Sequence, residues 1–159
     1  MVDSRRTHFT YPTIHGPITI CATPRGVVSV SFDDAPASDR FVATEITNRA
    51  ATEIQEYLAG KRSSFDIPLD VHGSPFQRAV WECVCELPYG TSCTAADVAE
   101  ALGKPGAHRS VGTAIRRNPA PILIPTHRVD LPNATGKVAR IFRALRALEQ
   151  TCVSGDRAD

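Results

Sequence analysis

Short runs of β-branched and aromatic residues, separated by turn residues, occupy the first third of the chain. The runs cover residues 9–11, 18–22 and 27–32, with His15-Gly16-Pro17 and Pro24-Arg25-Gly26 between them. This pattern predicts a small antiparallel sheet. Residues 41–59 then carry apolar side chains at helical spacing, and Gly60 follows where such a helix would end.

From residue 74 onward the pattern is that of helices. Ser74-Pro75-Phe76-Gln77 and Thr94-Ala95-Ala96-Asp97 each place a hydroxyl residue three positions before an amide or carboxylate, which is typical of a capping box. We therefore expect helices that begin after Ser74 and Thr94, and further helices at about 107–117 and 138–150. Trp81, with the nearby Cys83 and Cys85, is expected in the core.

Residues 61–73 have no sustained periodicity, so we expect a domain boundary near residue 72. The predicted fold class is α+β. A small antiparallel sheet and a helix form residues 1–72, a helical domain forms residues 73–152, and residues 153–159 form a flexible tail.

Composition sets broad limits on the function. The 159 residues suffice for one substantial domain or two small ones, and 42% hydrophobic with 22% charged residues is ordinary for a globular protein. No apolar run is long enough to cross a bilayer, and no secretory signal follows the N-terminus, so a cytoplasmic location is expected. The five cysteines form no metal-binding pattern and are expected to be reduced.

The net charge of +1 hides a strong asymmetry. Residues 1–100 carry eight basic and thirteen acidic residues, whereas residues 101–148 carry nine basic residues and one acidic residue. A basic segment of this kind is typical of a phosphate-binding face. The alternative is a solvated helix surface, above all for Arg140, Arg143 and Arg146 at a spacing of three.

The turn Lys104-Pro105-Gly106 joins two predicted short helices, the second of which carries Arg109, Arg116 and Arg117. This arrangement is a candidate helix-turn-helix. By itself it is a weak signal, because many helical hairpins bind no nucleic acid.

Several motifs together resemble the O6-alkylguanine-DNA alkyltransferase family over nearly the whole chain. The resemblance implies a winged helix-turn-helix-like domain that binds duplex DNA in the minor groove and contains the reaction centre. The motifs are residues 14–20, Gly73-Ser74-Pro75-Phe76-Gln77 with Val80-Trp81, residues 87–91, residues 106–112, residues 116–125 and Pro125-Thr126-His127-Arg128-Val129.

The resemblance also implies roles for individual residues. Thr126 occupies the position of the alkyl-accepting cysteine, His127 that of the histidine that takes up the thiol proton through a water, and Glu149 that of the glutamate that orients the histidine. Asn118 matches an asparagine that braces the turn before the active site. No cofactor or metal is implied, and a monomer is expected. Residues expected to contact DNA are Thr94, Ala95, Ala107, His108, Arg109, Ser110, Gly112, Arg116, Arg117 and Arg128.

Three departures from the family pattern argue against alkyl transfer. Thr126 replaces the cysteine, and a hydroxyl is less acidic and a poorer nucleophile toward an alkyl carbon than a thiol. Ala95 stands where the family usually has a tyrosine that helps to rotate the nucleotide out of the duplex. Residues 134–141 run directly into the last helix, without the glycine-rich loop that closes over the alkylated base.

Three hypotheses remain open at this point. The first is a DNA-repair-type protein that binds duplex DNA, with O6-alkylguanine as one candidate target, without transferring the alkyl group. Alkyltransferase-like proteins, which lack the cysteine, offer a model for it, although they carry tryptophan there and lack the N-terminal domain. The second is an alkyltransferase with residual or altered activity, and the third is a regulatory or partner-binding relic.

Overall fold

The computed structural model describes residues 5–33 and 40–157. The chain forms two compact units, one from Met1–His72 with Pro119–Leu123 and one from Gly73–Asn118 with Ile124–Asp159. None of the helices in the described ranges is both long and apolar enough to span a bilayer.

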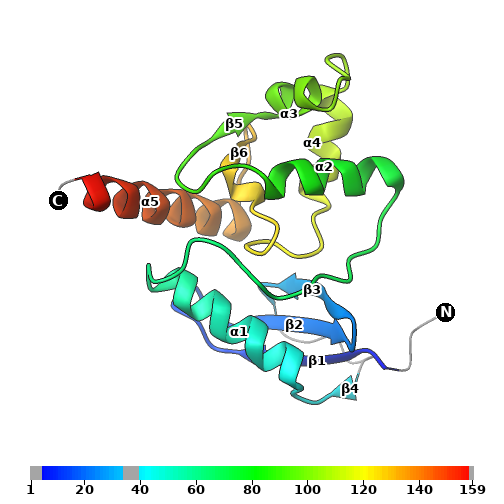
Figure 1. The fold of residues 1–159 in the computed structure, drawn as a ribbon, viewed down its shortest axis with the longest axis vertical. Helices are drawn as coiled ribbons and strands as arrows, with labels where there is room; N and C mark the ends of the chain where they lie inside the picture. Colours follow the sequence, from blue (N-terminus) through cyan, green and yellow to red (C-terminus); the bar gives the residue numbers. More distant parts are fainter. Residues whose placement is uncertain (1–4, 34–39, 158–159) are drawn as a thin grey trace. The chain divides into compact units, whose positions relative to one another are not determined.

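The first unit is a four-stranded sheet with one helix against it (Figure 1). The strands β1 (Thr7–Tyr11), β2 (Ile18–Thr23), β3 (Gly26–Ser31) and β4 (Arg40–Phe41) lie in the order β3-β2-β1-β4. The pairs β1–β2 and β2–β3 are antiparallel, whereas β4 is parallel to β1. The central strand β2 is buried throughout. The predicted antiparallel sheet is therefore present, with an added short edge strand.

Helix α1 (Glu45–Leu58) packs on this sheet and begins later than the predicted residue 41. Thr44 caps the helix, because its hydroxyl accepts from the backbone N–H of Thr47. Phe41 belongs instead to β4, where its ring stacks on Phe9 with the two ring centroids 4.8 Å apart. Phe41 therefore pairs with β1 at the edge of the sheet, although the sequence pattern had included it in the helix.

Two segments distant in sequence complete the first unit. Gly26 has a φ of +157° and lies so close to Pro68 that a Cβ would come within 2.5 Å of the Pro68 carbonyl oxygen. This close approach lets the Val27 N–H donate to the same oxygen at 2.9 Å. Further along the same strand, the Val30 N–H donates to the carbonyl of Pro119 at 2.9 Å, and residues 119–123 belong to this unit.

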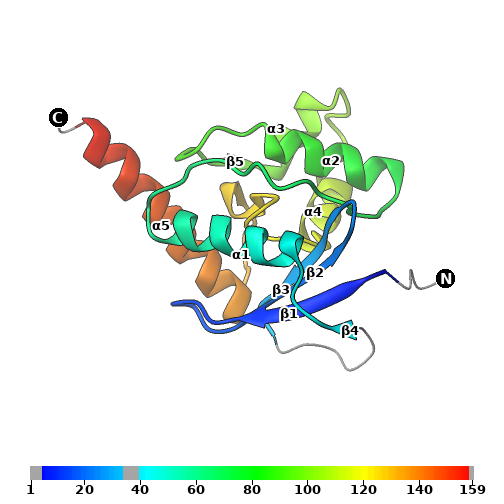
Figure 2. The same cartoon turned by 60° about the horizontal axis from the view of Figure 1, so that its bottom comes forward.

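The second unit is mainly helical (Figure 2), and its two short strands pair in parallel. Trp81 is buried, and its indole N–H donates to the carbonyl of Ala114 at 2.9 Å, which joins α2 (Pro75–Cys85) to α4 (His108–Arg116). Both predicted capping boxes are present, at Ser74 and at Thr94. The elements are α2 (Pro75–Cys85), β5 (Cys93–Thr94), α3 (Ala95–Ala101), α4 (His108–Arg116), the 3₁₀ turn η1 (Thr126–Arg128), β6 (Val129–Asp130) and α5 (Lys137–Arg157).

Two expectations for this unit are wrong. Residues 153–157 were expected in a flexible tail, but α5 continues to Arg157, and Val153 packs against Gly90. Cys85 was expected in the core, but it is exposed, and Cys83 is only half-buried. All five cysteines are free.

Candidate functional site

A buried 3₁₀ turn presents the residues of the central motif. The Thr126 N–H donates to the carbonyl of Ile124 at 2.8 Å, and the Arg128 N–H donates to that of Pro125 at 3.0 Å. Just before the turn, Ile122 adopts a φ of +77°, a region that β-branched residues rarely occupy. The sharp change of direction buries both Thr126 and His127, each of which is 1% exposed.

Asn118 links the end of α4 to this turn. Its Nδ2 donates to the carbonyl of Ile124 and to Oγ1 of Thr126, both at 2.9 Å. The hydroxyl oxygen of Thr126 is therefore held as an acceptor inside the unit. Local chain geometry explains the contact, because α4 ends at Arg116 and Asn118 follows the helical C-cap at Arg117.

His127 pairs with a carboxylate from the final helix. Its Nε2 lies 2.5 Å from Oε2 of Glu149, and both side chains are buried. Since a carboxylate only accepts, the ring proton lies on Nε2 and Nδ1 carries the lone pair. Burial lowers the pKa of His127 below 6.5, although Glu149 partly opposes this effect. Burial thus favours the neutral form of the ring.

Arg128 forms the second half of this buried cluster. Its Nε donates to Oε1 of Glu149 at 2.9 Å and its Nη2 donates to Oε2 at 3.1 Å, a bidentate ion pair. Its Nη1 donates to the carbonyl of Leu87 at 2.9 Å. The side chain is 7% exposed. It therefore lies off the surface on which a DNA contact of Arg128 was expected, and it neutralises Glu149 instead.

The turn after α2 also contributes to the cluster, which sequence reasoning missed. The Gly90 N–H donates to Oε1 of Glu149 at 2.9 Å, and the guanidinium of Arg128 lies 5.5 Å from the ring centroid of Tyr89. Gly90 has a φ of +80°, and a Cβ there would lie 2.4 Å from Val153. Burial raises the pKa of the Tyr89 hydroxyl, with a further contribution from its hydrogen bond to Cys152. The sequence could not reveal this role of Gly90, because the requirement for a glycine comes from its close packing against α5.

The titration of His127 tests this electrostatic description. The folded protein disfavours the protonated ring, so the unfolded chain takes up a proton at a higher pH than the folded chain does. His127 therefore reduces stability as the pH falls below about 6.5. We expect NMR signals of the His127 ring to titrate with a midpoint below 6.5. A midpoint at or above that value would contradict the dominance of burial over the Glu149 charge.

The residues expected to contact DNA fall mostly at the start of α4 and at the cap of α3. His108, Arg109, Ser110, Arg116, Arg117 and Thr94 are exposed, whereas Ala95 and Ala107 are half-buried. Gly112 is buried, and a Cβ there would lie 3.5 Å from Nη1 of Arg116, so it adds no exposed surface to this face.

Three of the thiols show no sign of activation. Partial desolvation, together with neighbouring carboxylates, raises the pKa of Cys83, Cys85 and Cys93 above the ordinary value. None of them belongs to the Thr126 turn. Within residues 5–33 and 40–157, no group of three or more His, Cys, Asp or Glu side chains is arranged to hold a metal ion.

Comparison with known proteins identifies the family. Residues 8–71 match the 6-O-methylguanine DNA methyltransferase ribonuclease-like domain, and residues 75–150 match the DNA binding domain of the same family. The methylated-DNA–protein-cysteine methyltransferase of Methanosarcina barkeri is 39% identical over 119 residues, which are 72% of this chain and 75% of that protein. The chain belongs to the 6-O-methylguanine DNA methyltransferase family.

Other members of the family agree with this assignment. The inducible methylated-DNA–protein-cysteine methyltransferase of Bacillus subtilis is 48% identical over 123 residues, 69% of each chain. The structure of the Mycobacterium tuberculosis O6-methylguanine methyltransferase has a TM-score of 0.82 and 29% identity, covering 92% of this chain and 93% of that one. The same organism's OGT, solved in complex with DNA, also gives a TM-score of 0.82, with 28% identity over 92% and 94% of the two chains. The predicted family and α+β fold class are confirmed.

Proposed function

We propose that this family member binds duplex DNA in the minor groove, through the exposed start of α4, and transfers no alkyl group. The observation that carries the proposal is the state of Thr126. Its Oγ1 accepts from Asn118 at 2.9 Å, and the residue is 1% exposed. A poorly nucleophilic oxygen, held as an acceptor in the interior, occupies the position at which the family resemblance requires a thiol.

The chemistry of the hydroxyl supports the loss of transfer. A neutral imidazole can take a proton from a thiol near neutral pH, but an alcohol is far less acidic. The Thr126 hydroxyl is therefore too weak an acid to give its proton to the His127–Glu149 pair. Replacing sulfur with oxygen also gives a harder nucleophile toward an alkyl carbon.

The surface of α4 supports retained DNA binding. His108, Arg109 and Ser110 are exposed in its first turn, and Arg116 and Arg117 are exposed at its other end. Small side chains beside an arginine suit close approach to a minor groove. The basic composition of residues 101–148 adds attraction for phosphates.

The mass of the protein after exposure to a damaged duplex tests the proposal. The full chain is incubated with a duplex that contains O6-methylguanine, and the intact mass is measured. We expect no methyl adduct, together with a salt-dependent mobility shift by the same duplex. A stoichiometric adduct would overturn the loss of transfer, and the absence of any shift would overturn DNA binding and favour the partner-binding alternative.

Residual alkyl transfer is the second candidate function. It is favoured by one observation: Asn118 donates to the side chain at the acceptor position, and the next residue, His127, pairs with Glu149. Relatives named as methyltransferases share the family. A slow, substoichiometric adduct in the mass measurement would support this candidate.

The contribution of Arg109 to DNA binding can be compared with that of a matched arginine on α5. Arg109→Ala should weaken duplex binding by about tenfold, because one close groove contact is lost. Arg143→Ala removes the same charge from another exposed helix and should change the affinity by about twofold or less. Both affinities can be measured by fluorescence anisotropy at the same salt concentration. Equal losses would indicate that binding is only diffuse charge attraction.

A further inference from the structure

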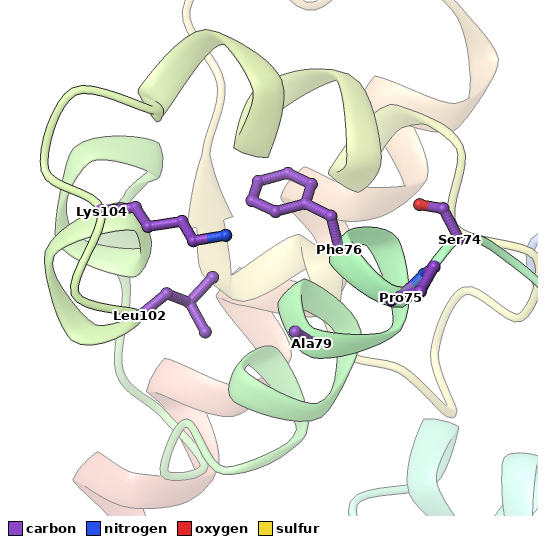
Figure 3. A pocket seen from close by; sticks show the side chains of 6 residues that line it. All are labelled: Ser74, Pro75, Phe76, Ala79, Leu102 and Lys104. Atoms are coloured by element: carbon purple, nitrogen blue, oxygen red, sulfur yellow. The ribbon is translucent and has the colours of Figure 1, made fainter.

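A pocket of the second unit lies apart from the Thr126 cluster, between the start of α2 and the segment after α3 (Figure 3). Its volume is about 490 Å³, within the range of small-ligand sites. The bounding side chains are mostly apolar. They are Ser74, Pro75, Phe76, Ala79, Leu102 and Lys104.

The pocket combines an aromatic ring with a cation. The Lys104 Nζ lies 5.3 Å from the centroid of the Phe76 ring, and Figure 3 shows the ammonium group directed toward that ring. In the part of the chain that the structure describes, no carboxylate is paired with Lys104. Ser74 Oγ accepts from the Gln77 N–H at 3.1 Å, which leaves the hydroxyl hydrogen able to donate. The pocket therefore offers an aromatic ring, a positive charge that lies over the ring, and a hydroxyl donor.

We propose that this pocket binds a single unstacked nucleotide, with the base between Phe76 and Leu102 and the phosphate on Lys104. The inference rests on the proposed DNA binding and adds a second point of contact to it. Aromatic rings stack on every type of base, and an unstacked base is commonly held between aromatic and apolar side chains. Lysine is an ordinary point-charge ligand of phosphate.

The position of the pocket favours a nucleotide over another apolar anion. Lys104 lies in the turn between α3 and α4, four residues before His108, where α4 begins. A strand that follows the exposed start of α4 would thus pass near the pocket. Thr126 is 1% exposed, whereas Lys104 is exposed and Phe76 is half-buried, so a base has easier access to the Phe76 pocket.

The test compares a duplex with a single-nucleotide bulge and a fully paired duplex of the same sequence, both labelled for anisotropy. We expect the full chain to bind the bulged duplex about tenfold more tightly. Phe76→Leu keeps an apolar side chain but removes the ring, and it should abolish this preference while changing the affinity for paired duplex by about twofold or less. Lys104→Gln should reduce the preference and lower the salt dependence of bulge binding by about one ion.

Controls separate this inference from the proposed function. Lys61→Gln, a matched removal of charge from an exposed residue that follows α1, should leave both affinities unchanged, and thermal melting checks that each variant folds. A preference for the bulged duplex that survives Phe76→Leu would overturn the nucleotide pocket. The proposed DNA binding would still stand if Arg109→Ala lowered the affinity for the paired duplex.

Free dGMP distinguishes a nucleotide within a strand from a free one. Saturable NMR shifts of the Phe76 ring and the Lys104 side chain on addition of dGMP would support the pocket even if no duplex were bound. In that outcome the proposed DNA binding fails and the nucleotide site stands. If dGMP shifts the NMR signals of neither residue, and the bulged duplex binds no more tightly than the paired duplex, the pocket inference is wrong.

Discussion

Glu149→Ala is expected to lower the free energy of unfolding by about 3–5 kcal/mol, because it leaves a buried arginine without its counter-ion. Glu149 accepts both donors of the Arg128 fork, the ring N–H of His127 and the Gly90 N–H. The substitution would remove the acceptor of four donors and leave a cavity in the interior. Chemical denaturation monitored by Trp81 fluorescence measures the loss.

A matched ion pair at the surface provides the control. Arg146 and Asp130 pair at 3.3 Å, with 36% and 61% of their side chains exposed. Asp130→Ala should cost about 1 kcal/mol or less, because solvent screens such pairs. Glu149→Gln keeps the shape and one acceptor oxygen, so its cost should fall between the two. Equal costs for Glu149→Ala and Asp130→Ala would mean that the buried cluster adds no more stability than a surface pair.

The parts of the fold that follow from local chemistry could be predicted from the sequence. Ser74 and Thr94 cap helices because their hydroxyl oxygens accept from backbone N–H groups three residues ahead. The three antiparallel strands follow from runs of β-branched residues between turn tripeptides. Such signals need only a few neighbouring residues.

The parts that depend on distant contacts could not be predicted in the same way. Residues 119–123 lie with the first unit because of a backbone hydrogen bond from Val30, and α5 extends beyond residue 150 where Val153 packs on Gly90. Neither contact leaves a periodic trace in the sequence.

The same contrast between local signals and distant contacts applies to the candidate site. The motif around Thr126 located the acceptor position. The family resemblance of the chain also predicted site roles for Asn118, His127 and Glu149. The same motif placed Arg128 on the DNA surface, whereas the structure pairs it with Glu149 in the interior. An arginine next to an active-site histidine has the same sequence signature in either role, since the sequence does not show which carboxylate lies within reach.

Thr126→Cys is expected to acquire alkyl transfer, but at a rate at least about 100-fold below that of the Mycobacterium tuberculosis O6-methylguanine methyltransferase measured alongside it. A sulfur at this position would lie next to Asn118, and His127 is a neutral base held by Glu149. The thiolate would form a bond to the methyl carbon as the bond from that carbon to O6 breaks, and guanine would leave after taking up a proton. Single-turnover mass measurement gives the rate.

The rate should remain low because delivery of the base is impaired as well as the nucleophile. Ala95 supplies no tyrosine to rotate the nucleotide, and residues 134–141 lead directly into α5 without the glycine-rich loop. The double variant Thr126→Cys with Ala95→Tyr should therefore react faster than Thr126→Cys alone, whereas Thr126→Ser should form no adduct. If Thr126→Cys alone matched the relative, the changes at Ala95 and in the loop would be neutral, and the threonine would be the sole barrier to transfer.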